Sequence, residues 1–173
     1  MVPQFVFCKP IPVNVRLSLC TDIEISDESK ELYDMIKGRV EFVHKQYGGD
    51  VYWEKIYTGI LASELKKLGY ITTLEEVINI FHNGDDVGCI RADLVVRGSH
   101  EFVIESKKCE SYRALKQVIG YMRGLKMSYG FVIKFLENRT EVWMIFRNDD
   151  VDGVRYYGYN NVGVYLINNT GVV

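Results

Sequence analysis

The chain has 173 residues, which is enough for one domain with a well-formed hydrophobic core. Hydrophobic residues make up 47% and charged residues 25%, as in ordinary soluble globular proteins, and the formal net charge is −2. This net charge argues against a protein that coats nucleic acid through many phosphate contacts, but it allows an enzyme that binds nucleic acid at one local site. The sequence contains no repeat or low-complexity run, so we expect a single domain over residues 1–173.

Cysteine and histidine usage argues against a structural zinc site. The four cysteines are widely spread without a C-x-x-C pair, and the three histidines lack zinc-type spacing. We recognise no secretory signal, and prolines and charged residues interrupt the apolar N-terminal stretch, so it cannot span a membrane. We therefore expect reduced thiols in an intracellular protein, cytoplasmic or nuclear, that is neither secreted nor membrane-bound.

The predicted elements begin with a strand over residues 11–19, where apolar and polar residues alternate strictly. Prolines in this segment favour a place at the edge of a sheet. Residues 26–29 have the composition of a helix start, and apolar residues at helical spacing extend that helix to Tyr47. After a glycine-rich break, a second helix is expected over residues 52–68, with Gly69 as its stop.

Residues 74–82 fit two structures. Glu75 and Glu76 suit the start of a helix, but the run of Val, Ile and Phe that follows suits a strand, and we favour the strand. The polar residues 83–86 then turn the chain. The remaining patterns predict a helix at 111–127 and strands at 88–96, 101–107, 129–136, 141–147, 154–158 and 162–168. This order favours one α/β domain.

The most informative residues are Asp93, Glu105 and Lys107, which lie on neighbouring predicted strands. Side chains alternate across a strand, so Glu105 and Lys107 share one face and Ser106 takes the other. If the two strands pair as a hairpin, Asp93 lies beside them. Two carboxylates and an ammonium group can hold a divalent metal and an attacking water. An exposed Glu–Lys ion pair is the other interpretation of the strand pair alone.

Context distinguishes this Glu-x-Lys from the two others in the chain. Those at 28–30 and 64–66 lie on predicted helices, where residues two apart point about 200° apart and cannot form one site. The helix after the strand pair carries a polar ridge at i, i+4 and i+8, formed by Arg113, Gln117 and Tyr121. The upstream helix holds Glu64, with Glu54 and Tyr57 nearby, and a carboxylate there can extend a metal shell.

This order of residues resembles the PD-(D/E)xK nuclease superfamily, and within it the small GxxExxY-type proteins. The segments that carry the resemblance fall within residues 38–135 and comprise Glu54–Tyr57, Ser63–Leu65 with Gly69, Val87–Gly88, Arg91–Val96, Val103–Lys107 and Gln117–Tyr121. Two positions depart from the pattern: Val51 stands where GxxExxY has its glycine, and Ala92 where the superfamily often has proline. The two ends of the chain have no counterpart that we recognise.

The resemblance implies an α/β fold with a restriction-endonuclease-like core over residues 28–147. This core has a central mixed β-sheet flanked by helices, and the segments 1–27 and 148–173 add peripheral strands. The resemblance also implies a metal-dependent deoxyribonuclease with Mg²⁺ or Mn²⁺ as its cofactor. Its partner is then nucleic acid, DNA rather than RNA.

By the same resemblance, Asp93 and Glu105 bind the metal, helped by the Ser106 backbone carbonyl, and Glu64 completes the shell. Lys107 orients the attacking water or stabilises charge on the phosphate. On the helix that follows, Gln117 is expected to be a member of the catalytic set. The substrate-binding residues expected on the same helix are Arg113, Lys116 and Tyr121.

Two other interpretations stay open. One is a catalytically silent nuclease-fold module that recruits a partner or binds nucleic acid through its terminal strands, as the near-neutral charge and the unmatched ends allow. The other is a homodimer or a subunit of a larger complex that uses the tyrosine-rich C-terminal segment as its contact surface.

Overall fold

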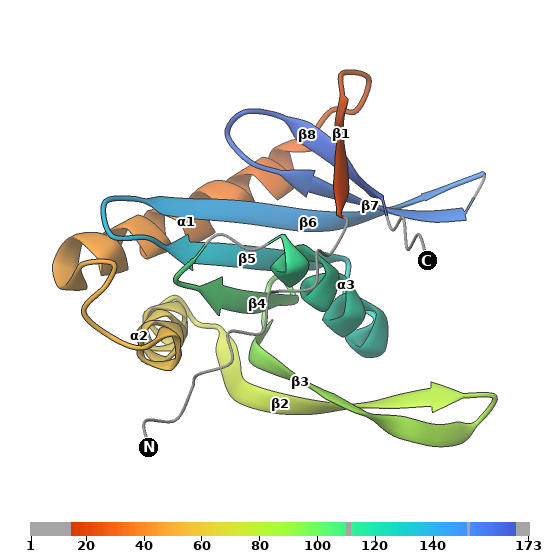
Figure 1. Ribbon diagram of the computed structural model, residues 1–173, viewed down its shortest axis with the longest axis horizontal. Coiled ribbons are helices and arrows are strands. Elements are labelled where there is room, and N and C mark those ends of the chain that lie inside the picture. The colour runs from red at the N-terminus through yellow and green to blue at the C-terminus, as the bar shows by residue number, and fades with distance from the viewer. Residues whose placement is uncertain (1–14, 110–111, 152, 169–173) are drawn as a thin grey trace, which may run out of the picture.

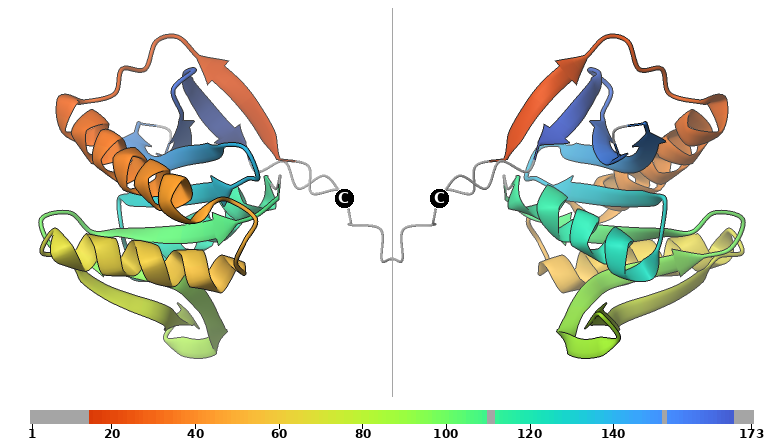
Figure 2. Two further views of the ribbon diagram at one scale, coloured as in Figure 1. Left: turned by 90° about the vertical axis from the view of Figure 1, so that its left-hand side faces the viewer. Right: turned by 90° about the vertical axis from the view of Figure 1, so that its right-hand side faces the viewer.

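The computed structural model describes residues 15–109, 112–151 and 153–168. Within them, three helices cover an eight-stranded sheet, with α1 and α2 on one face and α3 on the other (Figures 1 and 2). The helices are α1 (Asp27–Tyr47), α2 (Glu54–Lys67) and α3 (Arg113–Leu125). The strands are β1 (Arg16–Cys20), β2 (Ile71–His82), β3 (Asp85–Arg97), β4 (Phe102–Lys107), β5 (Tyr129–Phe135), β6 (Thr140–Asp150), β7 (Gly153–Tyr159) and β8 (Val164–Asn168).

The sheet is mixed, with the strand order β1-β8-β7-β6-β5-β4-β3-β2. Strands β4 and β5 run parallel and α3 connects them, whereas the other described neighbours are antiparallel. This arrangement confirms the expected α/β class with a restriction-endonuclease-like sheet. Among the described residues, no helix is long and apolar enough to cross a membrane.

The helix predictions are confirmed, and local chemistry explains their ends. The Ser26 side chain accepts a hydrogen bond from the Ser29 N–H and so caps α1. Helix α2 begins at Glu54, two residues later than expected, and Gly69 follows its end with a φ of 91° that suits glycine. Of the strand predicted at 11–19, residues 11–14 lie outside the described part, residue 15 precedes β1, and residues 16–19 belong to β1 at one edge of the sheet.

The ambiguous segment 74–82 is a strand, as favoured, and it belongs to a long ribbon. Strands β2 and β3 pair along their length and project beyond the rest of the sheet (Figure 1). Asn83 and Gly84 join them with positive φ values of 52° and 87°, as in the two-residue turns that match strand twist. Because β2 has no further described neighbour, this ribbon forms the second edge of the sheet.

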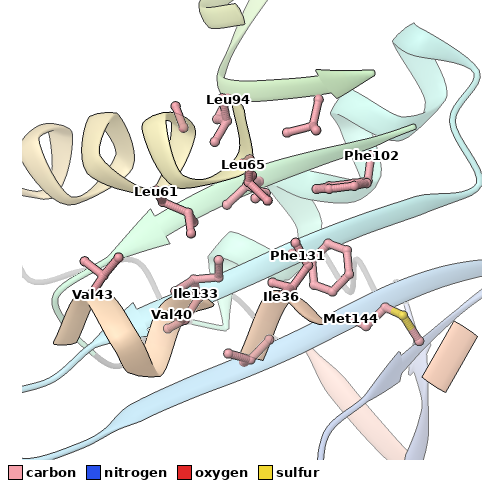
Figure 3. Close-up of a cluster of buried hydrophobic side chains, with 14 of the residues drawn as sticks. Ile36, Val40, Val43, Leu61, Leu65, Leu94, Phe102, Phe131, Ile133 and Met144 are labelled. Atoms are coloured by element: carbon pink, nitrogen blue, oxygen red, sulfur yellow. The ribbon is translucent and has the colours of Figure 1, made fainter. Parts of the chain in front are cut away.

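Two hydrophobic clusters hold the layers together. On one face, one buried cluster contains Ile36 and Val40 of α1, Leu61 and Leu65 of α2 and Phe102 of β4 (Figure 3). Each of these side chains is fully buried, and such burial contributes about 1.5–3 kcal/mol per residue. The second cluster packs α3 against the opposite face of the same strands. Strand β4 therefore lies between two apolar layers, and its polar residues Glu105 and Ser106 are withdrawn from water.

Helix α3 approaches β5 closely because residue 130 is a glycine. A Cβ atom at Gly130 would collide with the side chains of Val118 and Met122. The helix starts six residues after Lys107, the last residue of β4, so this close approach also sets where α3 lies beside the end of that strand.

We predict that Gly130→Ala lowers the free energy of unfolding by about 1–3 kcal/mol, because the added methyl group overpacks the α3–β5 contact. Gly38→Ala is the matched control, since Gly38 lies inside α1 with open space around its Cα, and alanine there should stabilise the helix by about 0.5–1 kcal/mol. Urea unfolding measures both changes. A Gly130→Ala variant as stable as the wild type would contradict the close packing of α3.

Candidate active site

Strand β4 carries a buried ion pair on the face that looks toward α3. Phe102 and Ile104 belong to the cluster under α1 and α2, whereas Val103 belongs to the cluster under α3. Alternation then puts Glu105 and Lys107 on the α3 side. The Lys107 Nζ lies 2.6 Å from Glu105 Oε1, and the Glu105 side chain is only 3% exposed.

Asp93 stands where two strands of the sheet separate. The pairing of β3 with β4 runs from Val96 back to Leu94 and ends there. Across the ribbon from Asp93, Glu75 has a positive φ of 52°, which interrupts the regular strand geometry. The Ser106 N–H donates a long hydrogen bond of 3.5 Å to Asp93 Oδ2, so Asp93 remains tied to the end of β4. The structure thus brings Asp93, Glu105 and Lys107 together.

A cleft of about 640 Å³ opens at this separation. Its walls come from the loop before α2, the first turns of α2, the bend of β2, the Asp93 position and the end of β4. The lining residues are Asp50, Trp53, Glu54, Lys55, Thr58, Leu74, Glu75, Asp93 and Lys108. The cleft therefore joins one of the predicted carboxylates to residues of α2 that the sequence places about forty positions earlier.

Glu54, the first residue of α2, reaches the end of β4 directly. Its Oε1 accepts a hydrogen bond of 3.0 Å from the Lys108 N–H. Three residues later, the Tyr57 hydroxyl accepts hydrogen bonds from the N–H groups of Val51 and Tyr52, at 3.1 and 3.3 Å. The Glu-x-x-Tyr motif thus has a structural meaning: the glutamate holds the end of the central strand, and the tyrosine holds the loop that leads into the helix.

The electrostatics of the site are dominated by burial. Burial raises the pKa of Glu105, the neighbouring charge of Asp93 raises it further, and the hydrogen bond from Lys107 opposes both without reversing them. Burial alone would lower the pKa of Lys107, but the hydrogen bond to Glu105 and the charges of Glu105, Glu54 and Asp93 outweigh it, so that pKa is raised. Lys107 is therefore held as a cation.

The residues predicted on α3 differ in how near their side chains lie to the carboxylates and to the cleft. Tyr121 is buried and does not line the cleft, and burial together with the charges of Glu105 and Asp93 raises the pKa of its hydroxyl. Gln117 is half-buried one helical turn before Tyr121. Lys116 is half-buried and Arg113 is exposed, and neither lines the cleft.

The structure does not bring Glu64 to the other carboxylates. Glu64 lies ten residues beyond Glu54, which is about 15 Å along the axis of α2. Its Oε1 binds Lys67 Nζ at 2.6 Å, and its Oε2 lies 3.9 Å from Arg39. The acidic group of α2 at the cleft is Glu54 instead, and its signal in the sequence was its place at the helix start, three residues before Tyr57.

Two further residues of the site region escaped sequence reasoning. Lys134 on β5 is the register partner of Lys107, is almost fully buried, and lies 3.2 Å from Glu141. A lone lysine inside the apolar run of β5 was the available signal. Trp53, in contrast, is 83% exposed at the rim of the cleft, and nothing in its local sequence distinguishes it from a core tryptophan.

The side chains present fit a small, hard divalent cation. Glu105 Oε2 is buried and has no hydrogen-bond partner within the part of the chain that the structure describes, and the charge of Asp93 acts on the same carboxylate. Mg²⁺ is commonly held by one or two carboxylates while it keeps several waters, and the Ser106 carbonyl is a third oxygen nearby. In the part of the chain that the structure describes, no three His, Cys, Asp or Glu side chains are already gathered as a metal cluster.

We predict that the metal-free protein loses stability as the pH rises through the raised pKa of Glu105. The folded state keeps the Glu105 proton to a higher pH than the unfolded chain does, so the contribution is complete below the ordinary glutamate pKa and disappears above the raised one. Urea unfolding in EDTA at pH values between about 4 and 8 measures it. Glu105→Gln should flatten this decline, and an equal decline in the variant would contradict the assignment.

Comparison with known proteins identifies one family. The family description "PD-(D/E)XK nuclease superfamily" matches residues 30–145. No curated protein matches the chain. Among solved structures, one titled "Crystal structure of SSO0001" is 19% identical with a TM-score of 0.35, and the match covers 66% of this chain and 65% of that one. Because the family match spans well over half of the sequence, the chain belongs to the PD-(D/E)XK nuclease superfamily.

Proposed function

We propose that this protein is a metal-dependent nuclease that hydrolyses DNA phosphodiester bonds at Asp93, Glu105 and Lys107, where Asp93 also lines the cleft between α2 and the end of β4. The observation that carries the proposal is the buried Glu105: its Oε1 binds Lys107, its Oε2 has no hydrogen-bond partner among the described residues, and the charge of Asp93 acts on the same carboxylate. A buried carboxylate without a second partner is costly unless a cation completes it. Membership of a nuclease superfamily supports a nucleic acid as the substrate.

The proposed role of each residue is based on the position of its side chain. Asp93 and Glu105, with the Ser106 carbonyl, would hold Mg²⁺ or Mn²⁺. Once held there, such a cation would supply a lowered pKa for a bound water and would offset charge on the phosphate. Lys107, kept protonated by Glu105, is unsuited to act as a general base; it orients the water and stabilises the negative charge that develops on the phosphate oxygens.

The surrounding residues would support this centre. Glu54 restrains the end of β4 through the Lys108 N–H, so it takes the supporting position that the sequence suggested for Glu64. Gln117 lies on the turn of α3 before Tyr121 and would help to position Lys107. On the exposed side of the same helix, Arg113 and Lys116 would contact phosphates of a longer substrate. These two contacts would add affinity without selecting a base sequence.

We predict that the purified protein cleaves DNA with Mg²⁺ or Mn²⁺ and not in EDTA. Glu105→Gln, Asp93→Asn and Lys107→Ala should each lower the cleavage rate by about 10²–10³-fold, the usual loss when one charge-stabilising group is removed. Gel assays on single-stranded, duplex and branched DNA measure the rates, and the melting temperature of each variant controls for folding. Cleavage that survives all three substitutions would show that the activity lies elsewhere.

We also predict that the two glutamates of α2 differ in their effect on metal binding. Glu54→Gln should weaken Mn²⁺ binding about 10- to 100-fold, the usual effect of losing an orienting carboxylate. Glu64→Gln should leave the affinity unchanged, because Glu64 is occupied by Lys67 and Arg39. Isothermal titration calorimetry measures both, and the reverse ranking would restore Glu64 as the metal-shell residue.

The same titration separates the enzyme from a catalytically silent module. If wild-type protein and Asp93→Asn give the same Mn²⁺ titration, Asp93 holds no metal, and a binding module that retains the nuclease fold becomes the better interpretation. A DNA complex that forms without any cleavage in Mg²⁺ or Mn²⁺ would support that interpretation as well.

A further inference from the structure

The largest exposed aromatic side chain of the described residues stands at the rim of the cleft. Trp53 is 83% exposed and lines the same cavity as Glu54 and Asp93. The other tryptophan of the chain, Trp143, is buried at 6% exposure in the cluster under α3. An indole group buries more apolar surface than most side chains when it contacts a partner. An exposed indole beside a polar site is therefore well placed to bind a ligand.

The backbone that carries Trp53 is firmly anchored. The Trp53 carbonyl accepts hydrogen bonds from the N–H groups of Ile56 and Tyr57, at 2.9 and 3.4 Å, and so opens the first turn of α2. The loop just before it is held by the Tyr57 hydroxyl. Tyr57 itself is fully buried and stacks on Phe135 with ring centroids 4.7 Å apart. The indole is therefore presented to solvent from a fixed position.

The cleft combines an apolar wall with charged groups. Trp53 and the half-exposed Leu74 supply the apolar surface, on two different elements. The two lysines of the lining are paired with acidic residues at its edge, Lys55 with Glu75 at 3.4 Å and Lys108 with Asp50 at 2.8 Å. These ammonium groups are available to exchange a carboxylate for a phosphate, so the cleft offers a flat aromatic face next to cations.

We propose that Trp53 stacks on the base of an unpaired nucleotide whose phosphate lies at the Asp93–Glu105 pair. The inference rests on the proposed nuclease function and specifies its substrate class: single-stranded or splayed DNA. In a continuous duplex each base is already stacked on its neighbours and must be extruded before it can meet an aromatic side chain. A base that is already unpaired stacks on tryptophan without that cost, and stacking tolerates any sequence.

The two tryptophans make the proposal directly measurable. In EDTA, and separately in Ca²⁺ with the Lys107→Ala variant, a short single-stranded oligothymidine should quench the protein fluorescence, because Trp53 is exposed while Trp143 is not.

Trp53→Ala should weaken binding of that strand roughly 5- to 150-fold by fluorescence anisotropy of a labelled strand, with little effect on blunt duplex. Trp53→Phe should abolish the quenching but keep affinity close to that of the wild type.

Phe81→Ala is the matched control, since Phe81 is also an exposed aromatic but lies near the tip of the β2–β3 ribbon and does not line the cleft. Its single-strand affinity should equal that of the wild type. Unchanged single-strand affinity in Trp53→Ala, or no quenching under either condition, would overturn the role of Trp53.

The outcome is separable from that of the proposed function. Cleavage that depends on Glu105 but prefers duplex DNA and ignores Trp53→Ala would leave the nuclease standing and refute the stacking site. Trp53-dependent binding of single strands without metal-dependent cleavage would refute the nuclease and keep the binding site. In cleavage assays, Trp53→Ala should raise KM for single strands far more than it lowers kcat, which a general loss of folding would not do.

Discussion

The structure depends on one constraint: a carboxylate and an ammonium group share the interior strand β4, which lies between two apolar layers. Lys107 neutralises one oxygen of Glu105 at 2.6 Å, and the second oxygen has no hydrogen-bond partner in residues 15–109, 112–151 and 153–168. Removing two charged groups from water is expensive, and their attraction repays it only in good geometry. A protein folded for stability alone would place apolar residues here, so the pair supports the proposed binding of a cation or a substrate at this place.

The cleft results from the way the sheet opens at Asp93. Pairing between β3 and β4 stops at Leu94, and the β2–β3 ribbon then leaves the sheet, with Glu75 in an unusual backbone conformation at the bend. The N-terminal end of α2 covers the opening, and Glu54 ties that end to β4 through the Lys108 N–H. A loss of strand pairing in one place and a hydrogen bond from the Lys108 N–H to Glu54 at the start of α2 in another together produce a concave site.

The contrast between Glu54 and Glu64 shows how far a motif can be interpreted without coordinates. Both lie on one helix and both precede the strand aspartate, so residue order does not separate them. Their surroundings do: Glu64 is paired within the helical layer, whereas Glu54 stands at the helix start over the end of β4. Because Glu64 follows Glu54 by ten residues in the same helix, the two residues lie about 15 Å apart along the helix axis, which is far more than the reach of any carboxylate.

The sequence alone determined the features that follow from the spacing of apolar residues and from residue type. These are the helices, the strands, the class of fold and the position of Glu105 and Lys107 on one face of a strand. These follow from local alternation, because a strand turns each side chain by half a turn regardless of its neighbours. Only the tertiary structure decided that β3 and β4 separate at Asp93, that Glu54 rather than Glu64 reaches the cleft, that Tyr121 is buried and that Trp53 is exposed. Each of these depends on packing between segments distant in the chain, and no local pattern records which neighbour will cover a given side chain.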